Sequence, residues 1–111
     1  MDERYEELWS RVEKAIETHW NEASEISDFM AAHPELGDEE YQASAKHAAF
    51  LAARGYEVEK PFCRRETAYR GVTGSSEEPR VVLLAEYDAL PEIGHACGHN
   101  VHGAMVLLAA A

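Results

Sequence analysis

Hydrophobic positions predict two helices in the first half of the chain. Residues 2–32 repeat apolar side chains at spacings of three, four and seven, which indicates one long amphipathic helix. Pro34 should end it, because the residue before a proline disfavours helical angles. The alanine-rich stretch 38–54 predicts a second helix, with Asp38 as its N-cap and Gly55 as a left-handed C-terminal cap. The apolar stripe of the first helix consists of Tyr5, Leu8, Val12, Ile16, Ala23, Ile26 and Met30.

After the second helix the period changes to that of strands. Residues 56–59 and 67–72 alternate in polarity, and a polar turn is expected at 74–79. Residues 80–86 hold a continuous apolar run, typical of a strand buried on both faces of a sheet. Residues 102–111 are apolar almost all round, which predicts a buried helix. The pattern as a whole predicts an α/β domain with two helices, then three strands and a buried helix.

Composition limits the kind of partner. The 111 residues fit a single domain, and 46% apolar with 28% charged residues is ordinary for a globular protein. A net charge of −11 argues against nucleic acid, because phosphate binding needs clustered Lys and Arg. No apolar stretch approaches the roughly 20 residues of a membrane-spanning helix. We therefore expect no binding to membranes. The two cysteines are too few for a disulfide framework, so we expect a protein of the reducing cytoplasm.

Side chains that can bind a metal are concentrated in the stretch AEYDALPEIGHACGHNVHGAM. It follows the predicted buried strand, where ligands of open α/β sheets bind. Because His95, Cys97 and His99 alternate, an extended loop would project all three to one side. Thiolate and imidazole bind zinc and similar ions, and Asp88 or Glu86 could add an oxygen ligand. The possible donors are Glu86, Asp88, His95, Cys97, His99 and His102.

Two other interpretations of Cys97 stay open at this point. With a nearby histidine it could be a thiol nucleophile and its base, although no orienting residue or oxyanion hole is marked. It could also be a small core residue among surface histidines, which three histidines in eight residues argue against. Elsewhere, His19, His33 and His47 are expected on helix surfaces or helix ends, and Cys63 has no chelating neighbour.

The motifs of this stretch resemble those of a known family. AEYDALP followed by GHACGHN is similar to the M20 metallopeptidases, in the amidohydrolase branch that includes aminoacylase-like and aminobenzoyl-glutamate hydrolase-like enzymes. HPELG at 33–37 and TAYRG at 67–71 fall in the same order as in that branch. The resemblance spans nearly the whole chain. It implies the N-terminal part of a zinc-exopeptidase-like catalytic domain that binds two divalent metal ions, zinc, manganese or cobalt.

The resemblance also implies roles for single residues. Cys97 and His99 match two metal ligands of the branch, and Asp88 matches an aspartate that orients the site. Glu86 stands where other members of the family have a ligand histidine, so it receives no ligand role here. The roles of His95 and His102 stay open.

The family enzymes are several times longer than this chain. Their general-base glutamate, further metal ligands and dimerisation domain follow the part that matches residues 1–111. We therefore expect 1–111 to be the N-terminal portion of a catalytic domain, inactive on its own. An apolar final helix that has no partner in the chain gives the same expectation.

The function implied by the resemblance is hydrolysis of an amide bond by the complete, homodimeric enzyme. The substrate would be a small N-acyl amino acid, an aminobenzoyl-glutamate-like compound or a dipeptide. The short gap between DALP and HAC favours the aminobenzoyl-glutamate or dipeptide subgroup. The alternative is a non-catalytic metal-binding fragment or module.

Overall fold

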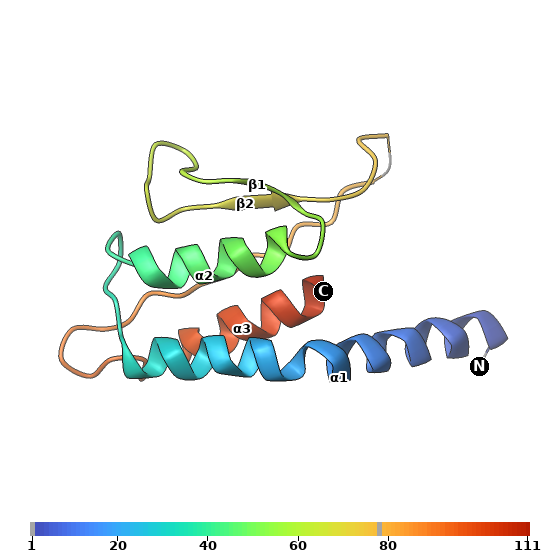
Figure 1. Ribbon diagram of the computed structural model, residues 1–111, viewed down its shortest axis with the longest axis horizontal. Helices are drawn as coiled ribbons and strands as arrows, with labels where there is room; N and C mark the ends of the chain where they lie inside the picture. Colours follow the sequence, from blue (N-terminus) through green and yellow to red (C-terminus); the bar gives the residue numbers. More distant parts are fainter. Residues whose placement is uncertain (1, 78) are drawn as a thin grey trace.

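The computed structural model describes residues 2–77 and 79–111, which form three helices and one two-stranded sheet (Figure 1). The mixed α/β class predicted from the sequence is confirmed. Within the described residues, none of the helices combines the length and apolar character needed to cross a membrane. The elements in chain order are α1 (Glu3–Ala32), α2 (Tyr41–Ala52), β1 (Glu57–Glu59), β2 (Arg70–Val72) and α3 (His99–Ala110).

Helix α1 begins and ends close to the predicted positions. Asp2 caps its N-terminus, because its carboxylate accepts a hydrogen bond from the Arg4 N–H at 3.0 Å. Its C-terminal end lies just before Pro34, as predicted. The N-terminal half projects beyond the rest of the chain, so only part of the predicted apolar stripe is buried (Figure 1). The buried stripe residues are Ala23, Ile26 and Met30, whereas Tyr5, Leu8, Val12 and Ile16 are exposed.

Helix α2 is shorter than the predicted range 38–54 and is capped differently. Two N–H groups of its first turn donate to the two carboxylate oxygens of Glu35, at 2.9 and 2.8 Å. Asp38 is therefore not the N-cap, and its φ of 65° places it in a turn before the helix. The left-handed glycine after the helix is confirmed, with a φ of 85° at Gly55.

Strands β1 and β2 form an antiparallel pair inside the predicted ranges 56–59 and 67–72. Glu57 lies opposite Val72, and Glu59 lies opposite Arg70. The loop that follows bends within the predicted turn at 74–79, of which residue 78 lies outside the described residues.

The third predicted strand, at 80–86, does not form. Within the described part of the chain, this segment pairs with neither β1 nor β2. An apolar run becomes a buried strand only where other strands border it and other elements cover both faces. The prediction was wrong for that reason. The most exposed residues of the run are Val81, Val82 and Leu84, at 88%, 75% and 77%.

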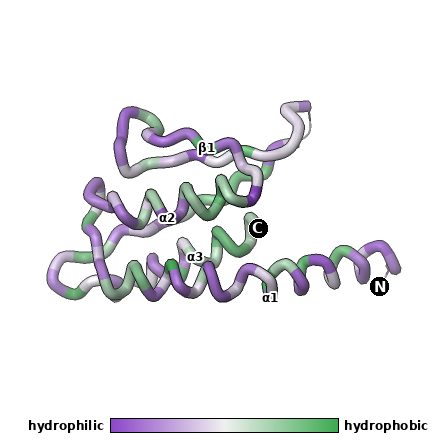
Figure 2. Tube along the Cα trace, in the orientation of Figure 1, coloured by the Kyte–Doolittle hydropathy of each residue, from purple (hydrophilic) through white to green (hydrophobic). Residues whose placement is uncertain are grey.

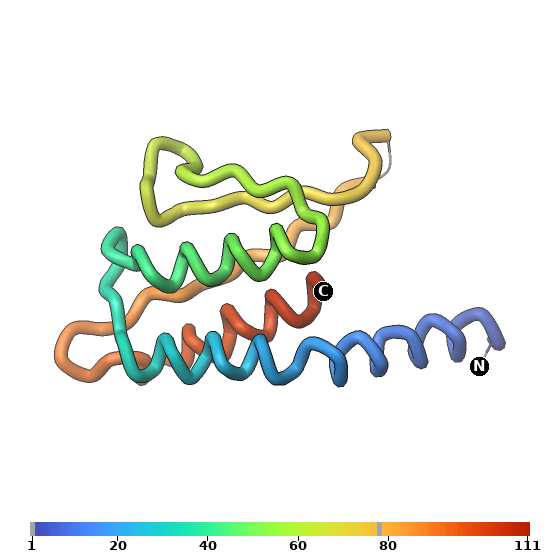
Figure 3. The backbone as a smooth tube through the Cα atoms, in the orientation of Figure 1, coloured from blue at the N-terminus to red at the C-terminus, as the bar shows by residue number. Residues whose placement is uncertain are grey.

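Helix α3 packs mainly against α1 and also contacts α2, and its C-terminal end lies between them (Figure 3). It begins at His99, earlier than the predicted range 102–111. It is hydrophobic along most of its length (Figure 2), yet Val101 and Met105 are more than half exposed. The prediction of a helix buried on all sides is therefore wrong, and so is the expectation that this helix has no partner in the chain, because α1 and α2 cover one of its faces. The covered face consists of Gly103, Ala104 and Leu107.

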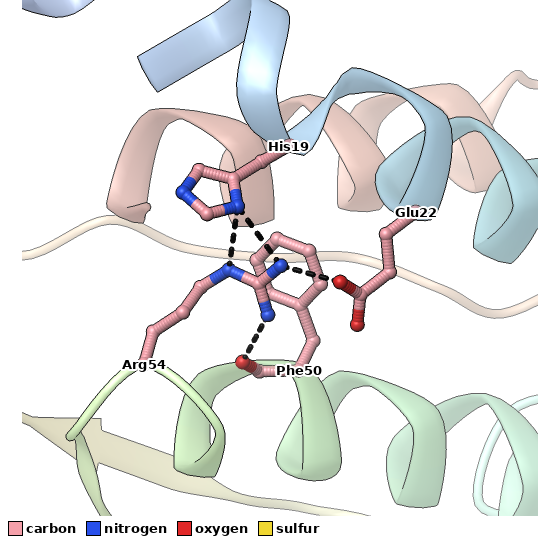
Figure 4. A network of polar contacts seen from close by, with 4 residues as sticks. All are labelled: His19, Glu22, Phe50 and Arg54. Atoms are coloured by element: carbon pink, nitrogen blue, oxygen red, sulfur yellow. Dashed lines mark hydrogen bonds and ion pairs between the residues drawn. The ribbon is translucent and has the colours of Figure 1, made fainter.

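Arg54 ties α1 to the C-terminal end of α2. Its guanidinium donates hydrogen bonds to Glu22 at 2.5 Å, to His19 Nδ1 at 3.1 Å and to the Phe50 carbonyl at 2.8 Å (Figure 4). It also lies 3.5 Å from the centre of the Phe50 ring, a cation–π arrangement. The Arg54 hydrogen bond lowers the pKa of Glu22 from its ordinary value.

We expect Arg54→Ala to lower the free energy of unfolding by about 2 kcal/mol, because it removes charge-assisted hydrogen bonds and the Phe50 contact. Arg70→Ala is the matched control. It breaks an ion pair with Glu59 in which both side chains are more than half exposed, so the loss should stay below about 0.5 kcal/mol. Urea unfolding measures both values. Equal losses would show that Arg54 contributes no more than a surface pair.

Candidate metal centre

The HPELG turn holds one end of the segment that carries the candidate acids. The Ala89 N–H donates to the Glu35 carbonyl at 2.7 Å, and Leu36 forms a parallel bridge with Ala89. The same Glu35 caps α2 with its side chain. Sequence reasoning assigned no role to Glu35, which here links the start of α2 to the segment 86–89.

His99, the first residue of α3, meets two carboxylates. Its Nδ1 lies 2.8 Å from Asp88 Oδ1, and its Nε2 lies 3.2 Å from Glu86 Oε2. The Asp88 hydrogen bond is the main cause of a raised pKa at His99, and the charge of Glu86 adds to it. When Asp88 accepts the Nδ1 proton, it fixes the orientation of the ring and leaves Nε2, which faces Glu86, as the second nitrogen.

The loop that carries Cys97 is not extended. The residues before Cys97 form turns, and Leu90 pairs with Gly94 across them. Gly98 has a φ of 80°, a conformation that favours glycine, and there the chain turns into α3. The extended loop from which the projection of His95, Cys97 and His99 to one side was predicted is therefore not present. The Cys97 thiol is free and exposed.

The other two histidines of the stretch are half-buried. Burial lowers the pKa of His95, and repulsion from His99 adds to this effect. His102 lies one helical turn after His99, as predicted. Among the described residues, neither ring Nδ1 has a hydrogen-bond partner.

The chemistry of Asp88, His99 and Cys97 suits part of a metal site. Nowhere in 2–77 or 79–111 do three or more His, Cys, Asp or Glu side chains form a group that could hold a metal ion. The chemistry of the donors nevertheless suits a zinc-like ion, because a carboxylate that holds one nitrogen of a histidine is the usual support for metal binding through the other. Asp88 and His99 have this arrangement, and the exposed Cys97 carries a thiol, a group of the kind that binds zinc.

A pocket of about 220 Å³ lies beside these carboxylates. Glu86 and Asp88 line it together with Arg65 and Thr67. Arg65 is paired with Asp38 at 2.6 Å. The pocket gives a small polar molecule room next to Asp88.

Beneath the segment lies a histidine that was predicted at a helix surface or end. His47 is 0% exposed, and its Nδ1 lies 2.8 Å from the Tyr69 hydroxyl. Its ring packs against Tyr87, with 5.0 Å between centroids, and the Tyr87 hydroxyl donates to the Thr67 carbonyl. Burial lowers the pKa of His47 to about 4, raises the pKa of Tyr87 to about 12 and raises the pKa of Tyr69 as well. The surface prediction was wrong, because this face of α2 is turned toward 86–88.

No protein-family model matches the chain, but several curated relatives do. It is 33% identical to the N-acetyl-L-cysteine deacetylase of Bacillus subtilis (strain 168), over 77% of this chain and 24% of the relative. It is 29% identical to a p-aminobenzoyl-glutamate hydrolase of Escherichia coli (strain K12), over 95% of this chain and 25% of the relative. It is 37% identical to the Xaa-Arg dipeptidase of Mus musculus, over 68% of this chain and 20% of the relative. The chain thus spans about a quarter of the length of the relatives that it matches.

By their names, these relatives are hydrolases: a deacetylase, an aminobenzoyl-glutamate hydrolase and a dipeptidase. The chain belongs to the M20/amidohydrolase family, as the resemblance of its motifs predicted.

The buried His47 should make stability depend on pH. The unfolded chain takes up a proton near pH 6.5, whereas folded His47 resists protonation down to about pH 4. Its contribution is fully present above pH 6.5 and is lost as the pH falls toward 4, which costs roughly 3 kcal/mol. We expect the free energy of unfolding, measured in urea at each pH, to fall less steeply across this window in His47→Asn than in the parent chain. The difference between the two slopes should correspond to the uptake of about one proton on unfolding. His33→Asn, at an exposed helix end, is the control and should keep the parent slope. An unchanged slope in His47→Asn would contradict a neutral buried His47.

Proposed function

We propose that the protein containing this chain is a metal-dependent hydrolase that cleaves the amide bond of a small N-acyl amino acid, an aminobenzoyl-glutamate-like compound or a dipeptide. In this proposal, residues 1–111 are the N-terminal portion of its catalytic domain. The main support for the proposal is the His99–Asp88 pair at 2.8 Å, in which His99 lies two residues after Cys97 in the chain. The names of the relatives support the substrate class.

Cys97 and His99 would hold one of two divalent ions, zinc, manganese or cobalt. When bound, such an ion polarises the amide carbonyl and lowers the pKa of water. Asp88 acts through His99: it accepts the Nδ1 proton and thereby presents Nε2 as the donor. Thiolate and imidazole are both good ligands for a zinc-type ion.

In this proposal, the residues that line the pocket bind the substrate and do not transfer its protons. The pocket beside Glu86 and Asp88 is the place where a small substrate would lie against the centre. By the family resemblance, the general-base glutamate lies outside residues 1–111. The chain alone should therefore bind metal more readily than it catalyses hydrolysis.

The test is hydrolysis by the protein at the length of its relatives, with N-acetyl amino acids, aminobenzoyl-glutamate and dipeptides as substrates and zinc, manganese or cobalt present. We expect turnover that a chelator abolishes. Cys97→Ala should lower kcat/KM by about 100-fold or more, because it removes a metal ligand. Cys63→Ala removes the other exposed free thiol and should leave kcat/KM unchanged.

Cobalt binding separates the two candidate functions. A thiolate-to-cobalt charge-transfer band that disappears in Cys97→Ala and persists in Cys63→Ala is expected for the proposed centre. The same band without any hydrolysis would favour a non-catalytic metal-binding module. A band that survives in Cys97→Ala would refute the assignment of this ligand.

A further inference from the structure

Gly103 brings α3 into contact with the backbone of the segment 86–88. A Cβ at this position would lie 2.7 Å from the Glu86 carbonyl oxygen, and 2.8 and 3.1 Å from Cε1 and Nε2 of His47. Distances under 3.0 Å are essentially never seen for a real Cβ. Because the nearest atom belongs to the backbone, it cannot rotate away as a side chain does. The observed approach of α3 is therefore open only to glycine at 103.

The same helix face carries the candidate ligand. Gly103 lies four residues after His99, so the two positions sit one above the other on α3. The helix thus meets the segment twice, at Glu86 through Gly103 and at Asp88 through His99. Any increase in the spacing at Gly103 would move His99 away from Asp88.

His47 supports the segment from within the core. Its fully buried ring lies against both Gly103 and Tyr87. Side chains along an extended segment alternate in direction. Tyr87 accordingly packs on His47, while its neighbours Glu86 and Asp88 both reach His99. The ring of His47 therefore fixes the position of the residue between the two carboxylates.

We propose that His47 and Gly103 are positioning residues: the buried ring and the missing side chain together set the distance at which Asp88 holds His99. The consequence for catalysis, a His99 ring oriented for metal, rests on the proposed function. The positioning itself belongs to the metal-free chain and can be measured there.

Helix propensity alone predicts that replacing Gly103 by alanine stabilises α3 and leaves the site intact, the opposite of what the close contact predicts. Inside a helix, alanine is more favourable than glycine by about 1 kcal/mol. Without the close contact, Gly103→Ala would leave the site in place and stabilise α3. A loss of the His99–Asp88 contact in this variant would therefore come from the contact with Glu86 and His47.

The experiment measures the ring ¹⁵N chemical shifts of His99 in metal-free protein, at one fixed pH, with and without Asp88→Asn. In the parent chain, Asp88→Asn should change the Nδ1 shift strongly, because an amide replaces the carboxylate that accepts its proton. In Gly103→Ala, the same substitution should change the shift by no more than about a third as much, since coupling between two residues is lost when they separate.

Gly71→Ala is the matched control. A Cβ there would lie 2.9 Å from Leu51 Cδ1, the flexible end of a side chain, and this variant should keep the full response to Asp88→Asn. If Gly103→Ala does not fold, Gly103→Ala combined with His47→Ala retains the contact with the Glu86 carbonyl without the ring, and it should show the same loss. A full response in the folded variant overturns the proposal. A lost response together with absent hydrolysis in the parent enzyme would refute the proposed function and leave the positioning intact.

Discussion

Helix α3 and the Glu86 carbonyl approach each other more closely at Gly103 than any side chain would permit, and three helices cooperate to keep them there. Arg54 ties α2 to α1, and Asn100 ties the start of α3 to Ser27 of α1 at 3.2 Å. Helix α2 contributes the His47 ring that lies against Gly103. Contacts from α1 and α2 thus hold α3 at the position in which His99 meets the two carboxylates.

The parts of the fold that follow from local chemistry could be predicted from the sequence. The proline after α1 bounds that helix through a residue next to it, and Gly55 ends α2 in the same way. The cap of α2 was missed because Glu35 reaches it from seven and eight residues away. The strand at 80–86 was predicted wrongly because an apolar run says nothing about whether a pairing strand lies beside it.

In the candidate site, too, residues that are marked by the local sequence could be predicted, whereas those that depend on distant partners could not. The pattern of acids, histidines and a cysteine placed Asp88 and His99 among six possible donors, the family resemblance then singled them out, and these two residues do meet. Gly103 and the burial of His47 were missed, because each acquires its role only through a partner distant in the chain. One signal was available for His47: it lies four residues after Ala43 and three before Phe50, on the apolar face of α2.

If Cys97 and His99 bind the same metal ion, X-ray absorption at the zinc edge of the zinc-loaded protein should detect both ligands at once. We expect a sulfur neighbour at about 2.3 Å together with nitrogen or oxygen neighbours at about 2.0 Å. The sulfur should be absent from the spectrum of Cys97→Ala and present in that of Cys63→Ala. A zinc ion surrounded by nitrogen and oxygen alone in the unsubstituted protein would show that Cys97 is not a ligand.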